Sequence, residues 1–293
     1  MELANITVGD MVLTQWNGVR MKQVISISRR TDIPAHYLDW LIERLSEGQV
    51  CVENPFNPRQ RRTVSLRPGD VHTLVFWSKN YRALLQNIRR FKMYPNLFFH
   101  FTINDCPTLE PRISPLTERL GQARELVTMC GPARFGWRFD PLVFWNGGKD
   151  NNMGGFERIA EFMAGLGVRR CIFSFARWYN KCVNRAKRRG FDYYDPPLDE
   201  KLAITDRLAR TAKSLGITMQ SCCGDDLTAV NNVEKAHCID GKVLSQLAGE
   251  PCDTRRDTSQ RTMCGCTKSV DIGSYHAQPC LHNCFYCYAN PAP

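Results

Sequence analysis

The stretch Gln23-Val24-Ile25-Ser26-Ile27-Ser28-Arg29-Arg30-Thr31-Asp32 joins an apolar run to a group of charged and polar side chains. A helical pattern of apolar residues follows it, from Tyr37 to Leu45. Runs rich in β-branched and aromatic residues predict strands, and this order of strand, polar turn and helix recurs along the chain. The predicted strands are Gln23–Ser28, Thr73–Trp77, Leu97–Ile103, Arg134–Phe139, Cys171–Phe175 and Ile217–Ser221.

Apolar residues at helical spacing separate the predicted strands. Ser114-Pro115 is typical of a helix start, with Ser114 as the N-cap and Pro115 as the first helical residue. Regular alternation of strands and helices favours parallel strands joined by right-handed crossovers. We therefore expect an α/β fold with a full or partial (β/α) barrel, and a doubly wound open sheet is the alternative. The expected helices cover residues 37–45, 81–91, 116–127, 156–163 and 202–212.

This pattern divides the chain into three regions. Residues 1–20 are expected to form a peripheral extension, in which Met11–Gln15 and the segment from Val19 make a hairpin around Asn17-Gly18. The barrel core is expected to occupy residues 21–221. Residues 222–293 are rich in cysteine, and we expect them to pack on the mouth of the barrel, where the strand ends of such folds build the site.

Composition indicates a soluble protein with reduced thiols. The 293 residues are 43% hydrophobic and 23% charged, no segment approaches a membrane span, and Met1–Asn5 lacks the features of a signal peptide. The 14 cysteines at irregular spacing predict a cytoplasmic protein whose thiols can bind metal. The net charge of +10 suits an anionic partner, either nucleic acid or a phosphorylated metabolite, or a solvated basic surface.

Three cysteines near the C-terminus have the spacing C-x3-C-x2-C, in the run Cys280-Leu281-His282-Asn283-Cys284-Phe285-Tyr286-Cys287. Three thiolates on one short loop can each bind one iron of a 4Fe–4S cluster, which leaves the fourth iron without a protein ligand. Electron-transfer clusters are held by four cysteines instead. A tetrahedral zinc site is the alternative. Cys264 and Cys266, or His276 and His282, could complete it.

The cysteine motif resembles that of the radical S-adenosylmethionine (SAM) enzymes. The resemblance implies an open iron that binds SAM, a radical formed by reductive cleavage of SAM, and an electron donor such as flavodoxin or ferredoxin. In those enzymes the cysteine loop follows the first strand, whereas here it follows all the predicted strands. Ser78-Lys79-Asn80 stands where a Gly-Gly-Glu-like segment usually binds the SAM amino group. The run Cys284–Tyr288 also resembles the loop of spore photoproduct lyase, a radical SAM enzyme that repairs DNA.

Further segments resemble family 1848 of the domains of unknown function. That family is described as carrying a radical-SAM-like cluster at its C-terminus, and it implies no substrate. With the cysteine loop, the resemblance extends from Met21 to Asn290. The segments that carry it are Ile25–Ala35, Asn54–Asn57, Phe76–Asn80, Cys264–Cys266 and Asp271–Gly273.

On the radical SAM interpretation, polar residues after the strands line a pocket for SAM and an unidentified, anionic substrate. For each of them a structural ion pair or a helix cap is an equal alternative, as for Asp32 just before Ile33-Pro34. The expected residues are Arg29, Asp32, Lys79, Asp140 and Arg177 for catalysis, Arg30, Asn80 and Tyr286 for cofactor contacts, and Cys280, Cys284 and Cys287 for the cluster.

A second set of cysteines lies outside this loop. Four of them are predicted to hold a second 4Fe–4S cluster or a zinc ion, with Cys223 left free. The alternative is that several are small buried hydrophobic residues. The competing function for the whole chain is a zinc-binding protein that binds nucleic acid, which the positive charge favours. The predicted ligands are Cys222, Cys238, Cys264 and Cys266.

Overall fold

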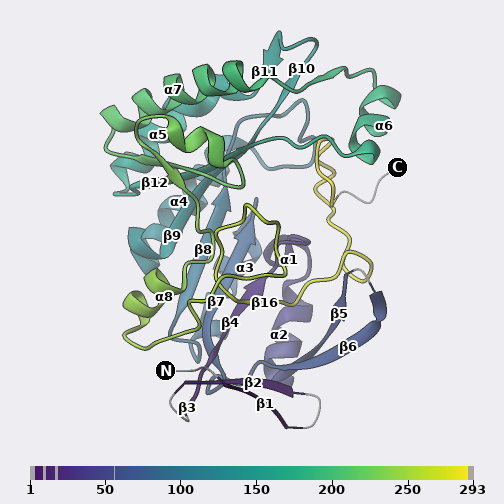
Figure 1. The fold of residues 1–293 in the computed structure, drawn as a ribbon, viewed down its shortest axis with the longest axis vertical. Helices are drawn as coiled ribbons and strands as arrows, with labels where there is room; N and C mark the ends of the chain where they lie inside the picture. The colour runs from purple at the N-terminus through teal and green to yellow at the C-terminus, as the bar shows by residue number, and fades with distance from the viewer. Residues whose placement is uncertain (1–3, 9–10, 17–18, 56, 290–293) are drawn as a thin grey trace.

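The computed structural model describes residues 4–8, 11–16, 19–55 and 57–289. Its centre is a sheet of eight parallel strands in the order β15-β14-β12-β9-β8-β7-β4-β16 (Figure 1). The strands are β4 (Gln23–Ile27), β7 (Val71–Ser78), β8 (Leu97–Thr102), β9 (Phe135–Leu142), β12 (Arg170–Phe175), β14 (Thr218–Ser221), β15 (Val233–Lys235) and β16 (Val270–Asp271).

The six predicted strands are all present, and from β4 to β14 they are neighbours in their chain order. This order confirms the parallel α/β prediction, and it lacks the reversal in mid-sheet that defines a doubly wound fold. A completely closed barrel is not observed. Within the described residues β15 pairs only with β14 and β16 pairs only with β4, so the two edges do not meet.

Helices connect consecutive strands, as the alternating pattern predicted. The five expected helices correspond to α2, α3, α4, α5 and α7, whereas α6 and α8 were not expected. The bounds are α1 (Ile33–His36), α2 (Leu38–Glu47), α3 (Arg82–Gln86), α4 (Leu116–Cys130), α5 (Phe156–Gly165), α6 (Asn180–Arg188), α7 (Leu198–Ser214) and α8 (Gly241–Ala248).

Helix α4 starts one residue later than predicted. Pro115 is its N-cap and Leu116 its first helical residue, so the prediction of Ser114 as the N-cap is wrong. Pro115 has an extended backbone, with φ −52° and ψ 149°, which places its ring just outside the first turn. The Ser114 carbonyl instead accepts a hydrogen bond from Arg119 Nε at 3.0 Å.

Smaller antiparallel sheets surround the central one. The pairing of β2 with β3 confirms the predicted N-terminal hairpin, although Asn17-Gly18 lies outside the described residues. The β5–β6 hairpin and the sheet of β11, β10 and β13 were not predicted. The bounds are β1 (Ala4–Val8), β2 (Met11–Trp16), β3 (Val19–Arg20), β5 (Gln49–Asn54), β6 (Asn57–Ser65), β10 (Phe144–Trp145), β11 (Asp150–Asn151) and β13 (Tyr193–Tyr194).

The two faces of the central sheet are covered by different parts of the chain. Side chains of a strand alternate between faces. Phe76 and its neighbours on one face pack with buried residues of α2, α3, α4, α5 and α7. Val75, the next residue back on β7, packs on the other face with Cys238, Cys264 and Cys266 of the cysteine-rich C-terminal region. The second cysteine set therefore lies on the face that the long helices leave uncovered.

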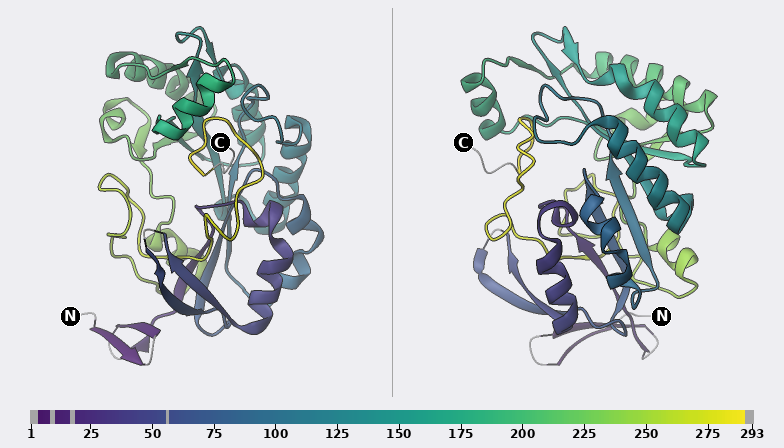
Figure 2. Two further views of the ribbon diagram at one scale, coloured as in Figure 1. Left: turned by 90° about the vertical axis from the view of Figure 1, so that its right-hand side faces the viewer. Right: turned by 180° about the vertical axis from the view of Figure 1, so that it is seen from behind.

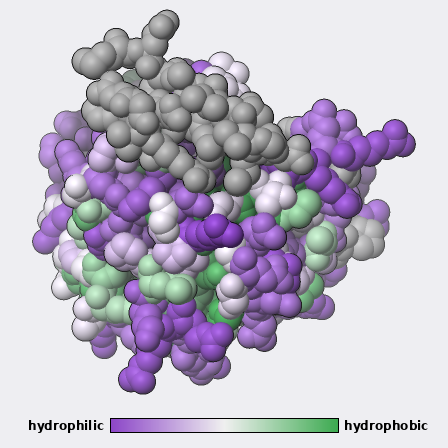
Figure 3. Space-filling view, turned by 90° about the horizontal axis from the view of Figure 1, so that it is seen from below, coloured by the Kyte–Doolittle hydropathy of each residue, from purple (hydrophilic) through white to green (hydrophobic). Residues whose placement is uncertain are grey.

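The C-terminal segment is placed by the pairing of β16 with β4. In Figures 1 and 2 this yellow segment runs along one side of the molecule, between α6 and the β5–β6 hairpin. Hydrophilic residues predominate over the coloured part of the face in Figure 3. None of the helices in the described ranges is long and apolar enough to cross a bilayer.

Candidate functional site

The C-terminal cysteine loop reaches the strand ends because β16 is parallel to β4. Val270 pairs with Ile25 and Asp271 with Ser26, so the residues after each strand leave the sheet at the same edge. The Tyr37 hydroxyl, just after α1, donates to the Pro279 carbonyl at 2.6 Å. A loop that is last in the chain thus lies beside the first strand of the sheet.

Asp32 joins this loop to two strand ends. Its carboxylate accepts the Ser78 hydroxyl at 2.7 Å and the Lys79 amide at 2.8 Å, and His282 Nε2 lies 2.7 Å from it. Burial acts to raise the pKa of Asp32, but the charge and hydrogen bond of His282, together with the hydrogen bonds from Lys79 and Ser78, hold the pKa below its usual range. Asp32 also caps α1 through the Ala35 amide, so the helix cap that was the alternative role for Asp32 is present.

A buried polar group lies under Cys284. Lys79 Nζ is 2.8 Å from Glu110 Oε1 and 3.2 Å from Asn104 Oδ1, and the Tyr286 hydroxyl donates to the same Glu110 oxygen. Burial acts to lower the pKa of Lys79, but the charges of Glu110 and Cys284 and the hydrogen bond to Glu110 together raise it, so the ammonium form is favoured. Glu110 Oε2 and Asn104 Nδ2 are buried and have no hydrogen-bond partner among the described residues. Buried polar atoms normally have partners, so these two are suited to bind a ligand.

Helix α6 holds the far end of the loop. Arg185 is buried in this helix and donates to the carbonyls of Phe285 and Cys287, at 2.9 and 3.1 Å. The Phe285 amide donates to the Leu109 carbonyl at 2.9 Å, and the Arg189 guanidinium lies 4.3 Å from the centroid of the Phe285 ring. The cysteine loop is therefore fixed by backbone contacts at its end as well as by His282.

The three thiols of the loop differ in exposure. Cys284 is buried, whereas Cys280 and Cys287 are half-buried. Burial raises the pKa of Cys280 to about 12, and burial and the Glu110 charge raise that of Cys284, which the Lys79 charge opposes. No three His, Cys, Asp or Glu side chains in the described part of the chain already surround a metal position. Holding a metal or a cluster would therefore require the thiols to deprotonate and turn.

The second set of cysteines forms a continuous group of thiols. The sulfur atoms of Cys222 and Cys238 are 3.7 Å apart. Further thiol hydrogen bonds join Cys222 to Cys223, Cys223 to Cys264, Cys264 to Cys266 and Cys266 to Cys238. The structure therefore brings together the four residues predicted as ligands, and it places Cys223 among them.

Asp140 and Arg138 lie beside the second set rather than beside the loop. Arg138 Nη1 donates to the Cys238 sulfur at 3.1 Å, and the same guanidinium pairs with Asp140. Asp140 also accepts the Ser174 hydroxyl. Asp140 was expected at the pocket for SAM, but here its carboxylate orients the arginine that contacts a thiol.

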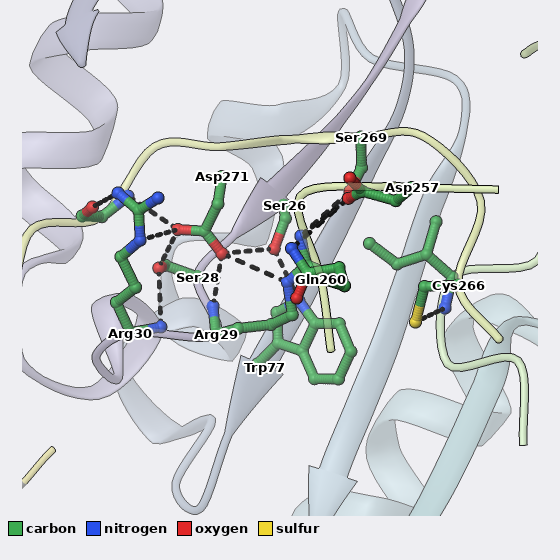
Figure 4. A network of polar contacts seen from close by, with 12 residues as sticks. Ser26, Ser28, Arg29, Arg30, Trp77, Asp257, Gln260, Cys266, Ser269 and Asp271 are labelled. Atoms are coloured by element: carbon green, nitrogen blue, oxygen red, sulfur yellow. Dashed lines mark hydrogen bonds and ion pairs between the residues drawn. The ribbon is translucent and has the colours of Figure 1, made fainter. Parts of the chain in front are cut away.

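Asp271 engages two further predicted site residues (Figure 4). Its carboxylate accepts hydrogen bonds from Ser28 and, at 2.7 Å, from the Arg29 amide. The guanidinium groups of Arg29 and Arg30 lie 3.5 and 3.9 Å from it, and Arg30 also donates to the Gly273 carbonyl at 2.9 Å. The two arginines thus attach the C-terminal segment to the end of β4.

The remaining predicted residues are Arg177, Asn80 and Tyr286, of which Tyr286 lies in the cysteine loop itself. Arg177 is exposed after β12. The Asn80 side chain accepts from the Arg82 amide and from Gln122, both at 3.0 Å, so it supports the start of α3. Tyr286 is buried against Glu110, as a residue shielding the loop would be.

Sequence reasoning missed Glu110, Arg138 and Arg185. Glu110 and Arg185 have no local signal, because Glu110 contacts residues 31 and 176 positions away and Arg185 contacts residues 100 and 102 positions away. The sequence did contain a local signal for Arg138. It lies between buried Trp137 and Phe139 in a strand, so the period-2 alternation of side chains points it to the opposite face from these aromatic residues.

These features define a parallel α/β protein with a three-cysteine loop across the carboxyl ends of its strands. The chain belongs to the family described as Domain of unknown function (DUF1848), which matches residues 24–289. No curated protein matches the sequence.

Proposed function

We propose that the protein is a radical SAM enzyme with a partial (β/α) barrel, whose cluster is held by Cys280, Cys284 and Cys287. The observation that carries the proposal is the position of this loop: it lies at the strand ends, tied to Asp32, Glu110 and Arg185. The C-terminal ends of parallel strands are where barrel enzymes place their chemistry. The unusual position of the motif in the sequence is compatible with this, because β16 pairs with β4.

The residues around the loop fit an open iron–sulfur cluster and SAM. Three cysteines supply three ligands, so a fourth coordination position is left for the amino and carboxylate groups of SAM. When bound, such a cluster supplies one electron that breaks a carbon–sulfur bond of SAM. The chain supplies binding and shielding. Lys79 places a positive charge near Cys284, and Glu110 Oε2 and Asn104 Nδ2 offer unpaired polar atoms beside it.

Phe285 and Tyr286 are proposed to exclude water from the loop. Both are buried, and they pack with Leu109, Val143 and Trp145 in one apolar cluster. Excluding water strengthens the electrostatic interactions of the groups inside and prevents side reactions of a radical. The substrate is proposed to be anionic, in keeping with the net charge of +10.

The exposed side of α6 suits an acidic electron donor such as flavodoxin or ferredoxin. Lys181, Lys187 and Arg188 are exposed there, on the helix whose buried Arg185 contacts the loop carbonyls. Complementary charge accelerates encounter between proteins. Nucleic acid would compete for the same charges, and DNA binding is the corresponding alternative for the substrate.

Anaerobic reconstitution with iron and sulfide, reduction with dithionite and addition of SAM test the proposal. We expect brown protein that slowly releases methionine and a 5′-deoxyadenosine species without added substrate. Methylthioadenosine in place of 5′-deoxyadenosine would indicate transfer of the aminocarboxypropyl group. Colourless protein with stoichiometric zinc and no sulfide would replace the proposal by the alternative, a zinc-binding nucleic-acid-binding protein. Intact SAM beside a reduced, fully loaded cluster would refute SAM cleavage.

A further inference from the structure

The second cysteine set is separate from the loop and is not used by the proposed function. Its five thiols come from the end of β14, from the segment before α8 and from the Cys264–Cys266 segment. They lie in the apolar cluster between the sheet and the C-terminal region, where Val75 and Ile172 also pack. Thiols scattered as small hydrophobic residues would not need to contact one another, yet each of these five hydrogen-bonds to two others.

Positive side chains surround this buried group. Arg138 donates to the Cys238 sulfur at 3.1 Å, and its side chain is only 9% exposed. Arg29 interacts electrostatically with Cys264 and Cys266, and Arg261 does so with Cys222 and Cys223. Arg138 and Arg29 already have counter-charges in Asp140 and Asp271, so their guanidinium groups do not require thiolates. Their positive charge nevertheless favours the thiolate form of the cysteines beside them.

Backbone amides also point at the sulfur atoms. The Ile239 amide donates to the Cys266 sulfur at 3.4 Å, and the Cys266 amide donates to Cys264. Gly265 allows the two segments to approach: a Cβ there would lie 2.6 Å from the Ala236 carbonyl and 3.0 Å from the His237 ring. Hydrogen bonds to sulfur favour the thiolate, the form that binds metal.

The spacing of one thiol pair favours a single ion over a second cluster, and binding would still require other thiols to turn, because no three of the described His, Cys, Asp or Glu side chains already surround a metal position. A Zn–S bond is about 2.3 Å long, so two ligands of a tetrahedral zinc ion are about 3.8 Å apart. The observed distance between Cys222 and Cys238 is 3.7 Å. A cubane cluster places its thiolates on different irons, which separates them more widely. We infer that Cys222, Cys238, Cys264 and Cys266 bind one structural Zn²⁺ ion.

Cys223 is the spare thiol. It adjoins Cys222 in the chain, and its φ of +59° is a left-handed backbone conformation. On binding, each ligand thiol that carries a proton releases it to solvent, and no electron is transferred. The ion would close the site with four protein ligands and tie the end of β14 to the C-terminal segments. This inference does not depend on the proposed radical SAM function.

Metal analysis of cluster-free protein tests the inference. The full chain with Cys280, Cys284 and Cys287 all changed to Ala would be purified from zinc-supplemented cells under reducing conditions. We expect about one zinc per chain, and X-ray absorption at the zinc edge should fit four sulfur neighbours at about 2.3 Å. Iron with stoichiometric sulfide in this variant would overturn the zinc assignment in favour of a second cluster. Protein without metal would overturn the site altogether.

Single substitutions in the same background identify the ligands. Cys238→Ala should lose the zinc. Cys223→Ala should keep it, and so should Cys171→Ala, which removes a buried thiol on the helix-covered face of the same sheet. Loss of zinc from Cys223→Ala with retention in Cys222→Ala would overturn the ligand set. If Cys238→Ala does not fold, the test rests on the X-ray absorption spectrum of the triple variant, in which the second set of cysteines is intact.

Discussion

The two cysteine regions of this protein differ in how they are built. The loop takes three cysteines from eight consecutive residues, and other parts of the chain hold it in place through Asp32, Glu110 and Arg185. The second set takes five cysteines from separate segments, and their thiols contact one another directly. Three protein ligands would leave a coordination position open at a centre held by the loop, whereas four would close the site formed by the second set. The comparison suggests one centre for chemistry and one for structure, and substitutions can separate them.

The largest expected effect is on SAM cleavage. Cys284→Ala removes one of the three proposed cluster ligands, so we expect cleavage to be abolished and loop-bound iron to be lost, while the zinc proposed for the second set remains at about one per chain. Product analysis by chromatography and metal analysis measure the two outcomes on the same sample. The matched control is Cys106→Ala, which removes a buried thiol from the apolar cluster that contains Cys284.

Cys106→Ala should keep both iron and cleavage, because Cys106 is outside the motif. If instead Cys284→Ala loses zinc together with iron, the two regions are not independent and the comparison fails. Cleavage that survives in Cys284→Ala, with SAM turned over at the wild-type rate, would show that the loop does not hold the reactive centre.

A second prediction concerns the free energy of unfolding. Lys79→Met leaves the Glu110 carboxylate buried without its cation, because the side chains of this pair are only 14% and 1% exposed. Removing one partner of a buried ion pair costs about 3–5 kcal/mol. Urea denaturation should show this loss. The double variant Lys79→Met/Glu110→Gln should recover a large part of it.

The matched control is the exposed pair of Asp206 and Arg210, whose side chains are 48% and 75% exposed. Arg210→Met should cost no more than about 0.5 kcal/mol, as is usual for exposed helix pairs. Equal losses in Lys79→Met and Arg210→Met would mean that the group below the loop is not a buried charge pair, and would weaken its proposed role in binding a ligand.

The fold could be predicted from the sequence where a local pattern specified it. The strands from β4 to β14 are recognisable because apolar runs such as Leu97–Ile103 end in polar residues. β15 and β16, of three and two residues, are too short to show a periodicity, and closure of the sheet depends on whether such edges meet. The cysteine loop was recognisable from the spacing of its cysteines. The pairing of β16 with β4, which positions this loop, was not recognisable from the sequence.

Candidate site residues could be predicted less well for the same reason. A polar residue after a strand is at the correct edge of the sheet, but its partner decides its role. Arg29 and Arg30 face Asp271, which arrives from the other end of the chain. Asp140 faces Arg138 and so lies with the second cysteine set. Of the predicted catalytic residues, Asp32 contacts His282 of the cysteine loop, and Lys79 contacts Glu110, which holds the loop.

The smallest expected effect is a pH dependence of the loop's attachment. The His36 ring lies against that of His282, with 4.3 Å between the ring centroids. Burial, and then the charge of His282, lower the pKa of His36 from 6.5 to about 4, although Asp32 opposes this. The unfolded chain therefore binds a proton more readily than the folded one. The stabilisation is complete above about pH 6.5 and is lost as the pH falls towards 4.

His36→Phe keeps a stacked ring without a titrating group, so the free energy of unfolding, measured in urea between pH 7 and 4, should fall less steeply than in the wild type. His276 is exposed and lies in the same C-terminal segment as His282, so His276→Phe is the control substitution. If the slopes of wild type and His36→Phe coincide, protonation of His36 does not oppose folding, and the pH dependence of the loop's attachment must be sought in Asp32 instead.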